Sequence, residues 1–265
     1  ISFIAGIAVD QVFGNFLSRI IYYIGVTWLG ILWLFFVSLL IYEPLRLFIS
    51  VQPRKVAYTI ITIVFLLTII AFINAQFLKV KTINLQGPAD FKIVQISDIH
   101  LGSTTSRYFG RIIKKINNIS PDIICITGDL IDQSNPRTLN NLKQIEQLKA
   151  PIYLVIGNHE KYIGINQISQ SLEKLNVTVL NNQLIDLPNL QVIGLKENTN
   201  PTQIPDIIKN FSLDKQKFTI LMYHYPFNFT RLKDNNINLT LTGHTHAGQI
   251  FPFNLIVRLS YPYIY

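Results

Sequence analysis

Two long charge-free runs in the first third of the chain constrain its fold more than any other feature. The first extends from Ile20 to Tyr42 and the second from Val56 to Leu78, and neither contains Asp, Glu, Lys or Arg. A helix needs about 20 apolar residues to cross the hydrocarbon core of a bilayer. Helices of a soluble core rarely run that long without a charged face. The two runs therefore predict two transmembrane helices.

These runs define an N-terminal membrane region. We expect it to comprise residues 1–78, with spans near 20–42 and 56–78. The apolar segment 1–9 is either the tail of an earlier span or a short interfacial segment. A cleaved signal peptide is a poor fit, because each long run exceeds the apolar core of such peptides. The sequence thus predicts a multi-pass protein of a cell membrane.

Basic residues beside the runs bear on the orientation of the spans, because cytoplasmic loops carry an excess of Lys and Arg. The two sides of the predicted membrane region differ little in their number of basic residues. The small difference favours a cytoplasmic loop between the spans and an extracytoplasmic polar domain. The residues compared are Arg46, Arg54, Lys55 and the opposing Glu43 in the loop, and Arg19, Lys79 and Lys81 on the other side.

The net charge of +8 raises the question of a polyanionic partner. Basic residues after Leu78, such as Arg111 and Lys114, are spread along the chain and form no block. Beside two spans, an anionic lipid surface is the simpler partner, and we expect no nucleic acid. The single cysteine, Cys125, lies in an apolar strand-like run, so packing is its expected role and no disulfide can form within the chain.

Downstream of a predicted linker, residues 79–90, strand-like runs alternate with segments of helical spacing. This alternation predicts a layered α/β domain over residues 91–265. Within it we expect a meander of three short strands between residues 177 and 195. The expected strands are 91–97, 122–127, 152–156, 177–180, 184–187, 190–195, 218–223, 238–242 and 250–257, and the expected helices are 107–119, 136–148, 166–175, 205–211 and 227–234.

All five histidines of the chain lie in short polar segments that follow apolar, strand-like runs. Histidines scattered through a core would not all fall at strand ends. A pair on one turn would be as typical of a structural role as of a metal site, but five such positions form a constellation. Imidazole is the commonest metal ligand. The five are His100, His159, His224, His244 and His246.

Oxygen ligands accompany these histidines. Asp98 stands two residues before His100, a spacing that puts both side chains on one face of an extended chain. Asp129 follows a fourth strand-like run, and Asn158 precedes His159. Imidazole and oxygen ligands without a thiolate suit Mn²⁺, Fe or Zn²⁺ and argue against a structural zinc of the cysteine type. The set is too large for one ion and about right for two.

Taken together, the motifs resemble those of the calcineurin-like metallophosphoesterase superfamily. The resemblance covers roughly Phe91 to Phe253, with the motifs in the family's order. It is strongest to the membrane-anchored bacterial branch that includes YkuE-like and YaeI-like phosphodiesterases. The motifs are Asp98-x-His100, Gly128-Asp129-x-x-Asp132, Gly157-Asn158-His159-Glu160, His224 and Gly243-His244-x-His246.

The resemblance implies a site for two divalent ions, with Mn²⁺ expected first and Fe or Zn²⁺ as alternatives. Asp98, His100 and His246 would hold one ion, Asn158, His224 and His244 the other, and Asp129 both. A hydroxide bridging the ions would attack the phosphorus atom.

The same resemblance assigns the remaining polar residues of the motifs. His159 would protonate the leaving oxygen as general acid, and Asp132 would orient it. Loop capping is the alternative role for Asp132. For Glu160, a solvated loop carboxylate is as reasonable as any functional role.

The fold that the resemblance implies is a four-layer α/β/β/α sandwich of two mixed sheets, here preceded by transmembrane helices. Members of the family continue with further strands after the Gly-His-x-His loop. We therefore expect the domain over residues 91–265 to be truncated at its C-terminus.

The function we expect is a membrane-anchored hydrolase of phosphate mono- or diesters, with lipid-linked phosphate or pyrophosphate as one possible substrate. One alternative is a nuclease or cyclic-nucleotide phosphodiesterase of the same superfamily. The sequence lacks the aromatic and basic groove pattern that holds single strands. Another alternative is a membrane protein that binds metal without turnover, but both Asp129 and His159 are present. Oligomeric state is not readable from the sequence.

Overall fold

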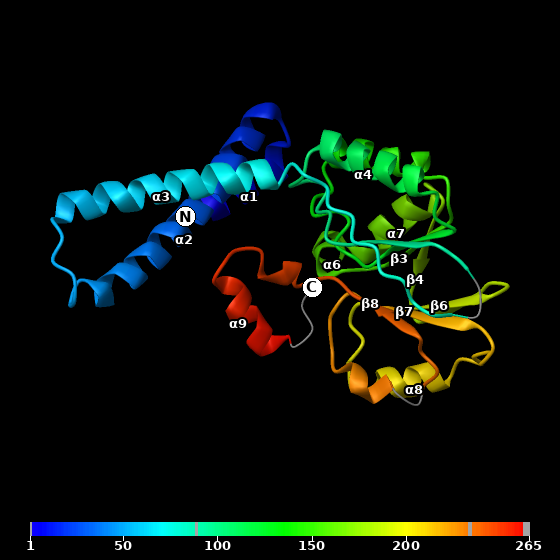
Figure 1. Ribbon diagram of the computed structural model, residues 1–265. Helices are drawn as coiled ribbons and strands as arrows, with labels where there is room; N and C mark the ends of the chain where they lie inside the picture. The colour runs from blue at the N-terminus through cyan, green and yellow to red at the C-terminus, as the bar shows by residue number, and fades with distance from the viewer. Residues whose placement is uncertain (1, 88–89, 233–234, 262–265) are drawn as a thin grey trace. The chain divides into compact units, whose positions relative to one another are not determined.

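The computed structural model describes residues 2–87, 90–232 and 235–261. The chain divides into two compact units, Ile1–Thr82 and Ile83–Tyr265 (Figure 1). The division falls inside the segment 79–90 that the sequence predicts as a linker. The described residues between α3, the last helix of the first unit, and β1, the first strand of the second, form no helix or strand.

The first unit consists of three helices, α1 (Ser2–Phe13), α2 (Phe16–Leu45) and α3 (Pro53–Asn74). Helices α2 and α3 contain most of the two charge-free runs and are long and apolar enough to cross a membrane. Only 6% of the most apolar window of each helix is buried. A core helix of a soluble protein would be mostly buried, so these exposed apolar surfaces indicate association with a membrane.

A capping box begins α2 after the turn at Gly14. The Asn15 side chain accepts the Ser18 N–H at 2.9 Å, and the Ser18 hydroxyl oxygen accepts the Asn15 N–H at 3.0 Å. Such reciprocal bonds satisfy N–H groups that lack partners inside the helix. The Ser18 hydroxyl also donates to Asp10 at 2.8 Å, and Arg19 pairs with Asp10 at 3.3 Å. These contacts hold the end of α1 against the start of α2.

The second unit contains two four-stranded sheets. The first has the order β1-β2-β3-β4, and all its neighbouring strands are parallel. The second has the order β5-β6-β7-β8, with an antiparallel β5–β6 pair and parallel pairs beyond it. The strands are β1 (Ile93–Ile96), β2 (Ile123–Ile126), β3 (Ile152–Val155), β4 (Val177–Leu180), β5 (Gln183–Asp186), β6 (Leu190–Gly194), β7 (Phe218–Met222) and β8 (Leu239–Leu241).

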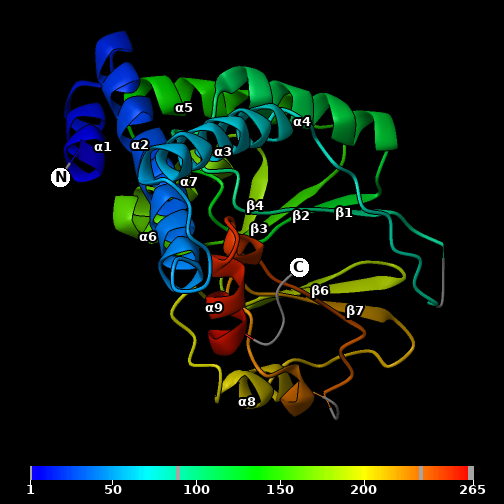
Figure 2. The ribbon, with the colours of Figure 1, turned by 60° about the vertical axis from the view of Figure 1, so that its left-hand side comes forward.

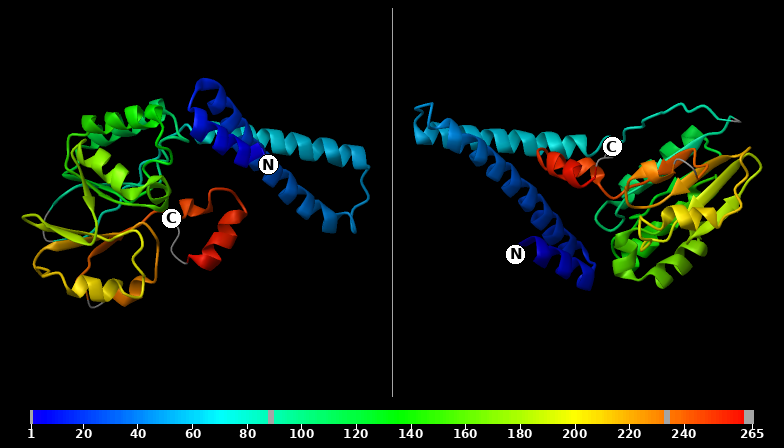
Figure 3. Two further views of the ribbon diagram at one scale, coloured as in Figure 1. Left: turned by 180° about the vertical axis from the view of Figure 1, so that it is seen from behind. Right: turned by 90° about the horizontal axis from the view of Figure 1, so that it is seen from below.

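Helices cover the outer faces of the two sheets, so the unit has four layers. Figures 1 and 2 show α4 and α8 on opposite sides of the paired sheets, and the view from behind in Figure 3 agrees. The predicted four-layer α/β arrangement is confirmed. The helices are α4 (Ser106–Ile119), α5 (Pro136–Leu142), α6 (Asn158–Ile163), α7 (Ile165–Glu173), α8 (Ile204–Lys209) and α9 (Phe253–Ser260), with short 3₁₀ segments η1 (Lys143–Gln147), η2 (Phe229–Leu232) and η3 (His246–Gly248).

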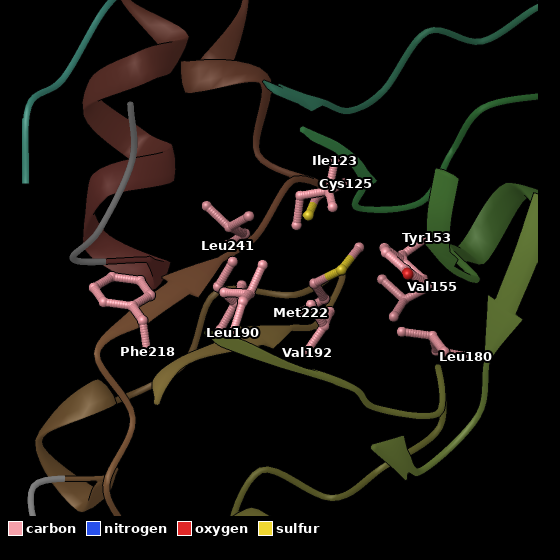
Figure 4. Packing of buried hydrophobic residues seen from close by; sticks show 11 residues of the cluster. Ile123, Cys125, Tyr153, Val155, Leu180, Leu190, Val192, Phe218, Met222 and Leu241 are labelled. Carbon is pink, nitrogen blue, oxygen red and sulfur yellow. The ribbon is translucent and has the colours of Figure 1, made fainter. Parts of the chain in front are cut away.

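The core between the sheets forms from alternate side chains of facing strands. Cys125 of β2 and Val155 of β3 face Val192 of β6 and Met222 of β7 (Figure 4). Strands β2, β3, β6 and β7 are buried along their whole length. Parallel strands covered on both faces read as continuous apolar runs, which is why the sequence identified them. Packing at Cys125 agrees with its predicted role.

Helix α4 shows how the outer layers attach. Phe109, Ile112, Ile113 and Ile116 are buried along one face, at the spacing that predicts an amphipathic helix. The Thr105 side chain accepts the Tyr108 N–H at 3.2 Å and caps the first turn.

Several predictions of local structure are wrong. Residues 177–195 do not form a meander, because β4 pairs with β3 in the first sheet and only β5 and β6 pair with each other. The turn between the sheets passes through Asn182, whose positive φ permits a sharp change of direction. The first sheet is parallel throughout, whereas two mixed sheets were expected.

The predicted strand 250–257 is also wrong, since helix α9 occupies Phe253–Ser260. Its apolar residues Leu255, Ile256 and Leu259 recur at helical spacing. The predicted helix 136–148 divides into α5 and η1, and the predicted helix 227–234 is reduced to η2. Residues 233–234 of that prediction lie outside the described residues.

Gly194 permits the close approach of the sheets, and this generates a test. A Cβ at this position would overlap the Cβ of Leu180 on β4. We expect Gly194→Ala to lower the free energy of unfolding by about 1–3 kcal/mol, because extra atoms in a packed core force rearrangement. The midpoint of urea unfolding measures the change.

Gly110→Ala is the matched control for this variant. Its new Cβ would meet only the end of the flexible Gln144 side chain, and it would lie within α4. We expect unchanged stability or a gain of up to about 1 kcal/mol. Equal midpoints for Gly194→Ala and the wild type would contradict the role of Gly194.

Candidate metal centre

The polar side chains predicted as ligands come from the carboxyl ends of strands in both sheets. Asp98 and His100 follow β1, Asp129 follows β2, and His244 and His246 follow β8. The Nε2 atoms of His100 and His246 lie 3.1 Å apart although the residues are 146 positions apart in the chain. The two sheets therefore bring remote loops to one place.

One cluster consists of Asp98, His100 and His246. One ligand atom from each lies within 4.8 Å of the others. His246 Nε2 is 3.4 Å from Asp98 Oδ1. The Asp98 carboxylate also accepts the backbone N–H of His244 at 3.0 Å, which ties the loop after β1 to the loop after β8.

A second cluster consists of Asp129, His224 and His244, again with ligand atoms within 4.8 Å of one another. Asn158 joins this cluster, because its side-chain oxygen lies 3.0 Å from His224 Nε2 and 3.0 Å from His244 Nδ1. The structure thus brings together all seven predicted metal ligands.

The Asp129 carboxylate belongs to the second cluster and also faces the first. Its Oδ2 atom is 3.3 Å from His224 Nε2 and 3.9 Å from His100 Nε2. Burial raises the pKa of Asp129, but the hydrogen bond from His224 and the charges of His224 and His159 outweigh burial and lower the pKa to about 2. The Asp129 carboxylate therefore favours its ionised form near pH 7, and it faces both clusters.

The donor chemistry of the second cluster fits a cation. The His224 Nδ1–H donates to the carbonyl oxygen of Thr127 at 2.8 Å, and Nε2 faces oxygen atoms of Asp129 and Asn158. Burial lowers the pKa of His224, but Asp129 outweighs burial and raises the pKa. A proton on Nε2 therefore faces these oxygen atoms. A divalent cation would replace that proton, because metal ions bind the neutral imidazole.

Two other histidines remain neutral and so available as ligands. Burial, helped by His159, lowers the pKa of His100 to about 4. Burial also lowers the pKa of His244, with His224 as the next cause. Metal ions bind the neutral imidazole, so these shifts remove competition from protons near pH 7.

The ligand loops adopt backbone conformations that few residues tolerate. Positive φ angles occur at Asp98, His100, Asp129, His244 and His246, with values between 47° and 74°. Asp, Asn and His enter this left-handed region more readily than other non-glycine residues, at some cost in free energy. Five such residues at one site indicate that the loops are held in place for a function.

Glycine is required where two of these loops cross. A Cβ at Gly157 would overlap the Asp129 carboxylate. Gly128 has a φ of 90°, and a Cβ there would lie 2.8 Å from the Gly157 backbone. The two glycines let the loops after β2 and β3 approach closely.

His159 lies beside the clusters but is more open than the ligands. Its side chain is 37% exposed, whereas that of His224 is fully buried. Its backbone N–H donates to Asp129 Oδ1 at 2.9 Å, and its ring centre is 4.4 Å from that of His100. The ring is thus held next to the clusters and still accessible to a substrate.

Asp132 lies at the same edge of the site. Its carboxylate accepts the backbone N–H of Ser103 at 3.0 Å and also the Ser103 hydroxyl. Its Oδ2 lies 4.0 Å from His100 Nδ1, and Asp132, His100 and His159 each place one ligand atom within 4.8 Å of the others. Both the capping role and the orienting role are compatible with this position, so the orientation of His159 by Asp132 stays a prediction.

Glu160 has a structural role at the site. The sequence alone did not decide between a solvated carboxylate and a functional role for this residue. It is fully buried, so the solvated alternative is wrong. Its carboxylate accepts the backbone N–H groups of Asp129, Ile131 and Gly157 at 2.9–3.0 Å. Burial raises its pKa to about 6 against these hydrogen bonds. The usable signal was Gly157-x-x-Glu160, the spacing of a helix N-cap and its third residue.

The known proteins that resemble this chain share one family description. The family model described as "Calcineurin-like phosphoesterase" matches residues 91–248. A protein named "Uncharacterized metallophosphoesterase" from Helicobacter pylori is 35% identical over 66% of this chain and 50% of its own length. "Transmembrane protein with metallophosphoesterase domain" from Bos taurus is 32% identical over 65% of this chain and 44% of its own. "Uncharacterized metallophosphoesterase YkuE" from Bacillus subtilis is 34% identical over 62% of this chain and 61% of its own.

These relatives bear out the predicted superfamily and its YkuE-like branch. The chain spans about half the length of the Helicobacter relative. The family uses divalent metal ions, which agrees with the clusters described above.

Glu160→Gln tests the role of the buried carboxylate. The replacement has one oxygen, so its NH₂ group must face at least one of the three N–H donors. We expect the free energy of unfolding to fall by about 1–3 kcal/mol, because a buried donor loses its acceptor. Urea unfolding in the presence of chelator separates this effect from metal binding.

Glu173→Gln serves as the control, because Glu173 is an exposed residue of α7. We expect its stability to stay within about 0.5 kcal/mol of the wild type. If Glu160→Gln matched this control, the three hydrogen bonds would not hold the loops.

Proposed function

Because the chain belongs to the calcineurin-like phosphoesterase family, we propose that it hydrolyses phosphate mono- or diesters at a site for two divalent ions. The observation that carries the proposal is the pair of ligand clusters, of which the second contains Asp129 and the first faces the same carboxylate. One ion would be too few for seven converging ligands, since catalytic sites offer three or four protein ligands to each metal.

The ligand atoms divide between the ions as the clusters do. Asp98, His100 and His246 would hold one ion, and Asn158, His224 and His244 the other, with Asp129 contributing to both. The bound ions would supply an activated water and offset the charge of the phosphate. Mn²⁺ is the proposed ion, with Fe or Zn²⁺ as alternatives for the same ligand types.

His159 is the proposed general acid. Its exposed ring lies beside His100, while its backbone N–H is fixed on Asp129. A proton held on this ring can pass to the leaving oxygen, which would otherwise depart as an anion. Asp132, at the neighbouring position, would keep the His159 ring in a productive orientation.

The membrane helices narrow the class of substrate that we propose. Helices α2 and α3 would form a multi-pass anchor with the phosphoesterase domain outside the cytoplasm. The described residues between α3 and β1 form no helix or strand, and this segment would tether the domain to the anchor. A phosphate ester or pyrophosphate carried by a lipid would reach such a site by diffusion in the membrane.

Hydrolysis of bis-(p-nitrophenyl) phosphate and p-nitrophenyl phosphate tests the enzyme class. We expect turnover with Mn²⁺ and none with chelator. Asp129→Asn should lose at least about a thousandfold in kcat, because both ions share this carboxylate. His159→Ala should lose about 10²–10⁴-fold in kcat while still binding Mn²⁺, because it removes a proton donor and no ligand.

Asp206→Asn is the control for these variants, since Asp206 is exposed and pairs only with the neighbouring Lys209 among the ionic contacts described. It should leave kcat unchanged. Bound Mn²⁺ without hydrolysis of either ester would contradict the proposed activity on simple esters. A panel of lipid phosphates would then decide between a more specific hydrolase and a protein that only binds metal.

The proposed orientation has its own test, because the only cysteine is buried. Ser50→Cys places a thiol in the loop between α2 and α3, and Thr202→Cys places one on the phosphoesterase unit, both at exposed positions. We expect a membrane-impermeant maleimide to label Thr202→Cys in intact cells and to label Ser50→Cys only after lysis. The reverse pattern would contradict the orientation, and the unlabelled wild type is the control.

A further inference from the structure

A buried carboxylate outside the predicted ligands suggests how the second cluster is held. Glu197 lies in the loop after β6 and is 4% exposed. Its Oε1 atom accepts the Tyr225 hydroxyl at 2.7 Å, and its Oε2 atom lies 3.1 Å from Lys161 Nζ. A buried carboxylate is costly unless it is paired and hydrogen-bonded. Of its two partners, Tyr225 packs against predicted ligands, and Lys161 is on the helix that begins at the predicted ligand Asn158.

The first partner, Lys161, belongs to helix α6, which begins at Asn158. This helix has six residues, too few to be stable without tertiary contacts. The Lys161–Glu197 pair ties it to the second sheet, because Glu197 follows β6. The pair therefore restrains the element that carries the Asn158 side chain.

The second partner, Tyr225, directly follows His224. Its ring centre lies 5.0 Å from that of His224 and 4.6 Å from that of His244, edge to face in both cases. The bond from its hydroxyl to Glu197 fixes the direction of the ring. A fixed ring limits the rotation of both imidazoles that pack against it.

We refer to Glu197, Lys161 and Tyr225 as the Glu197 network. It contacts or restrains the three elements that supply Asn158, His224 and His244. The structure gives no hydrogen bond, ion pair or ring contact between this network and Asp98, His100 or His246 in the part of the chain that it describes.

We propose that Glu197 is a positioning residue for the second metal ion, acting through Lys161 and Tyr225 on the ligands Asn158, His224 and His244. This inference rests on the two-ion site proposed above and deepens it. Under this proposal, the affinity of the second ion depends on Glu197, although Glu197 binds neither ion. The affinity of the first ion does not depend on it.

The test is Mn²⁺ binding to the purified full chain, followed by calorimetry and by electron paramagnetic resonance. The wild type should bind two ions and show the spectrum of a spin-coupled pair. Glu197→Ala should raise the Kd of the second ion by about 10–100-fold, the usual effect of losing a residue that orients ligands. The Kd of the first ion should change by less than about twofold, and the spin-coupled spectrum should require higher Mn²⁺.

Milder variants separate positioning from loss of fold. Tyr225→Phe keeps the ring and removes the hydroxyl, and Glu197→Gln keeps an acceptor for Tyr225 and removes the charge that pairs with Lys161. Each should weaken the second ion less than Glu197→Ala does. If Glu197→Ala fails to fold, these two variants decide the question by the same measurement.

Asp186→Asn is the matched control. Asp186 also accepts from one lysine, Lys217 at 2.7 Å, and one neutral donor, Gln191 at 3.1 Å, but it lies at the opposite end of β6. It should change neither Kd. Two outcomes would overturn the role of Glu197 if the wild type binds two ions. In the first, the Kd of the second ion is unchanged in the variants. In the second, the variants weaken the binding of both ions equally. A wild type that binds a single ion would overturn the two-ion site itself.

Discussion

The carboxylate of Asp129 is the group on which the rest of the site depends. One oxygen faces His100 and His224, which come from different sheets, and the other accepts the backbone N–H of His159. Its own backbone N–H donates to Glu160. Because this anion faces both clusters, it attracts positive charge in both of them. The loops of the two sheets must therefore be held around this carboxylate, at the spacing that the proposed pair of ions would require.

That arrangement is costly for the protein. Five of the predicted ligand residues occupy left-handed backbone conformations, and carboxylates lie where water is largely excluded. The apolar core between the sheets offsets these costs, because strands buried on both faces give a rigid base for the loops. Two buried glutamates complete the support from different sides. Glu160 accepts three N–H groups of the ligand loops, and Glu197 is proposed to restrain the ligands of one ion through side chains.

Sequence reasoning succeeded where a feature is local. The apolar runs that became β2, β3 and β7 are recognisable because both faces are buried, and the polar residues at their ends stand out against them. It failed where a segment has no strong period of its own. Residues 177–195 look like three equivalent strands, yet the first joins another sheet. The segment of helix α9 was predicted as a strand because it has so many apolar residues that they fit both the helical and the strand spacing.

By itself, the sequence determined the family, the layered α/β class, two helices able to span a membrane, and which side chains to expect at the candidate metal centre. Motif spacing and apolar periodicity are properties of residues that are close together in the chain, so they can be recognised before the fold is known. Only the tertiary structure decided the partners of buried charge. Glu160 and Glu197 look like ordinary glutamates in the sequence. Apart from Gly157, which precedes Glu160 by three residues, their donors lie 28 to 36 residues away. The role of a buried carboxylate depends on which remote donors the fold brings to it, because burial without them is unfavourable.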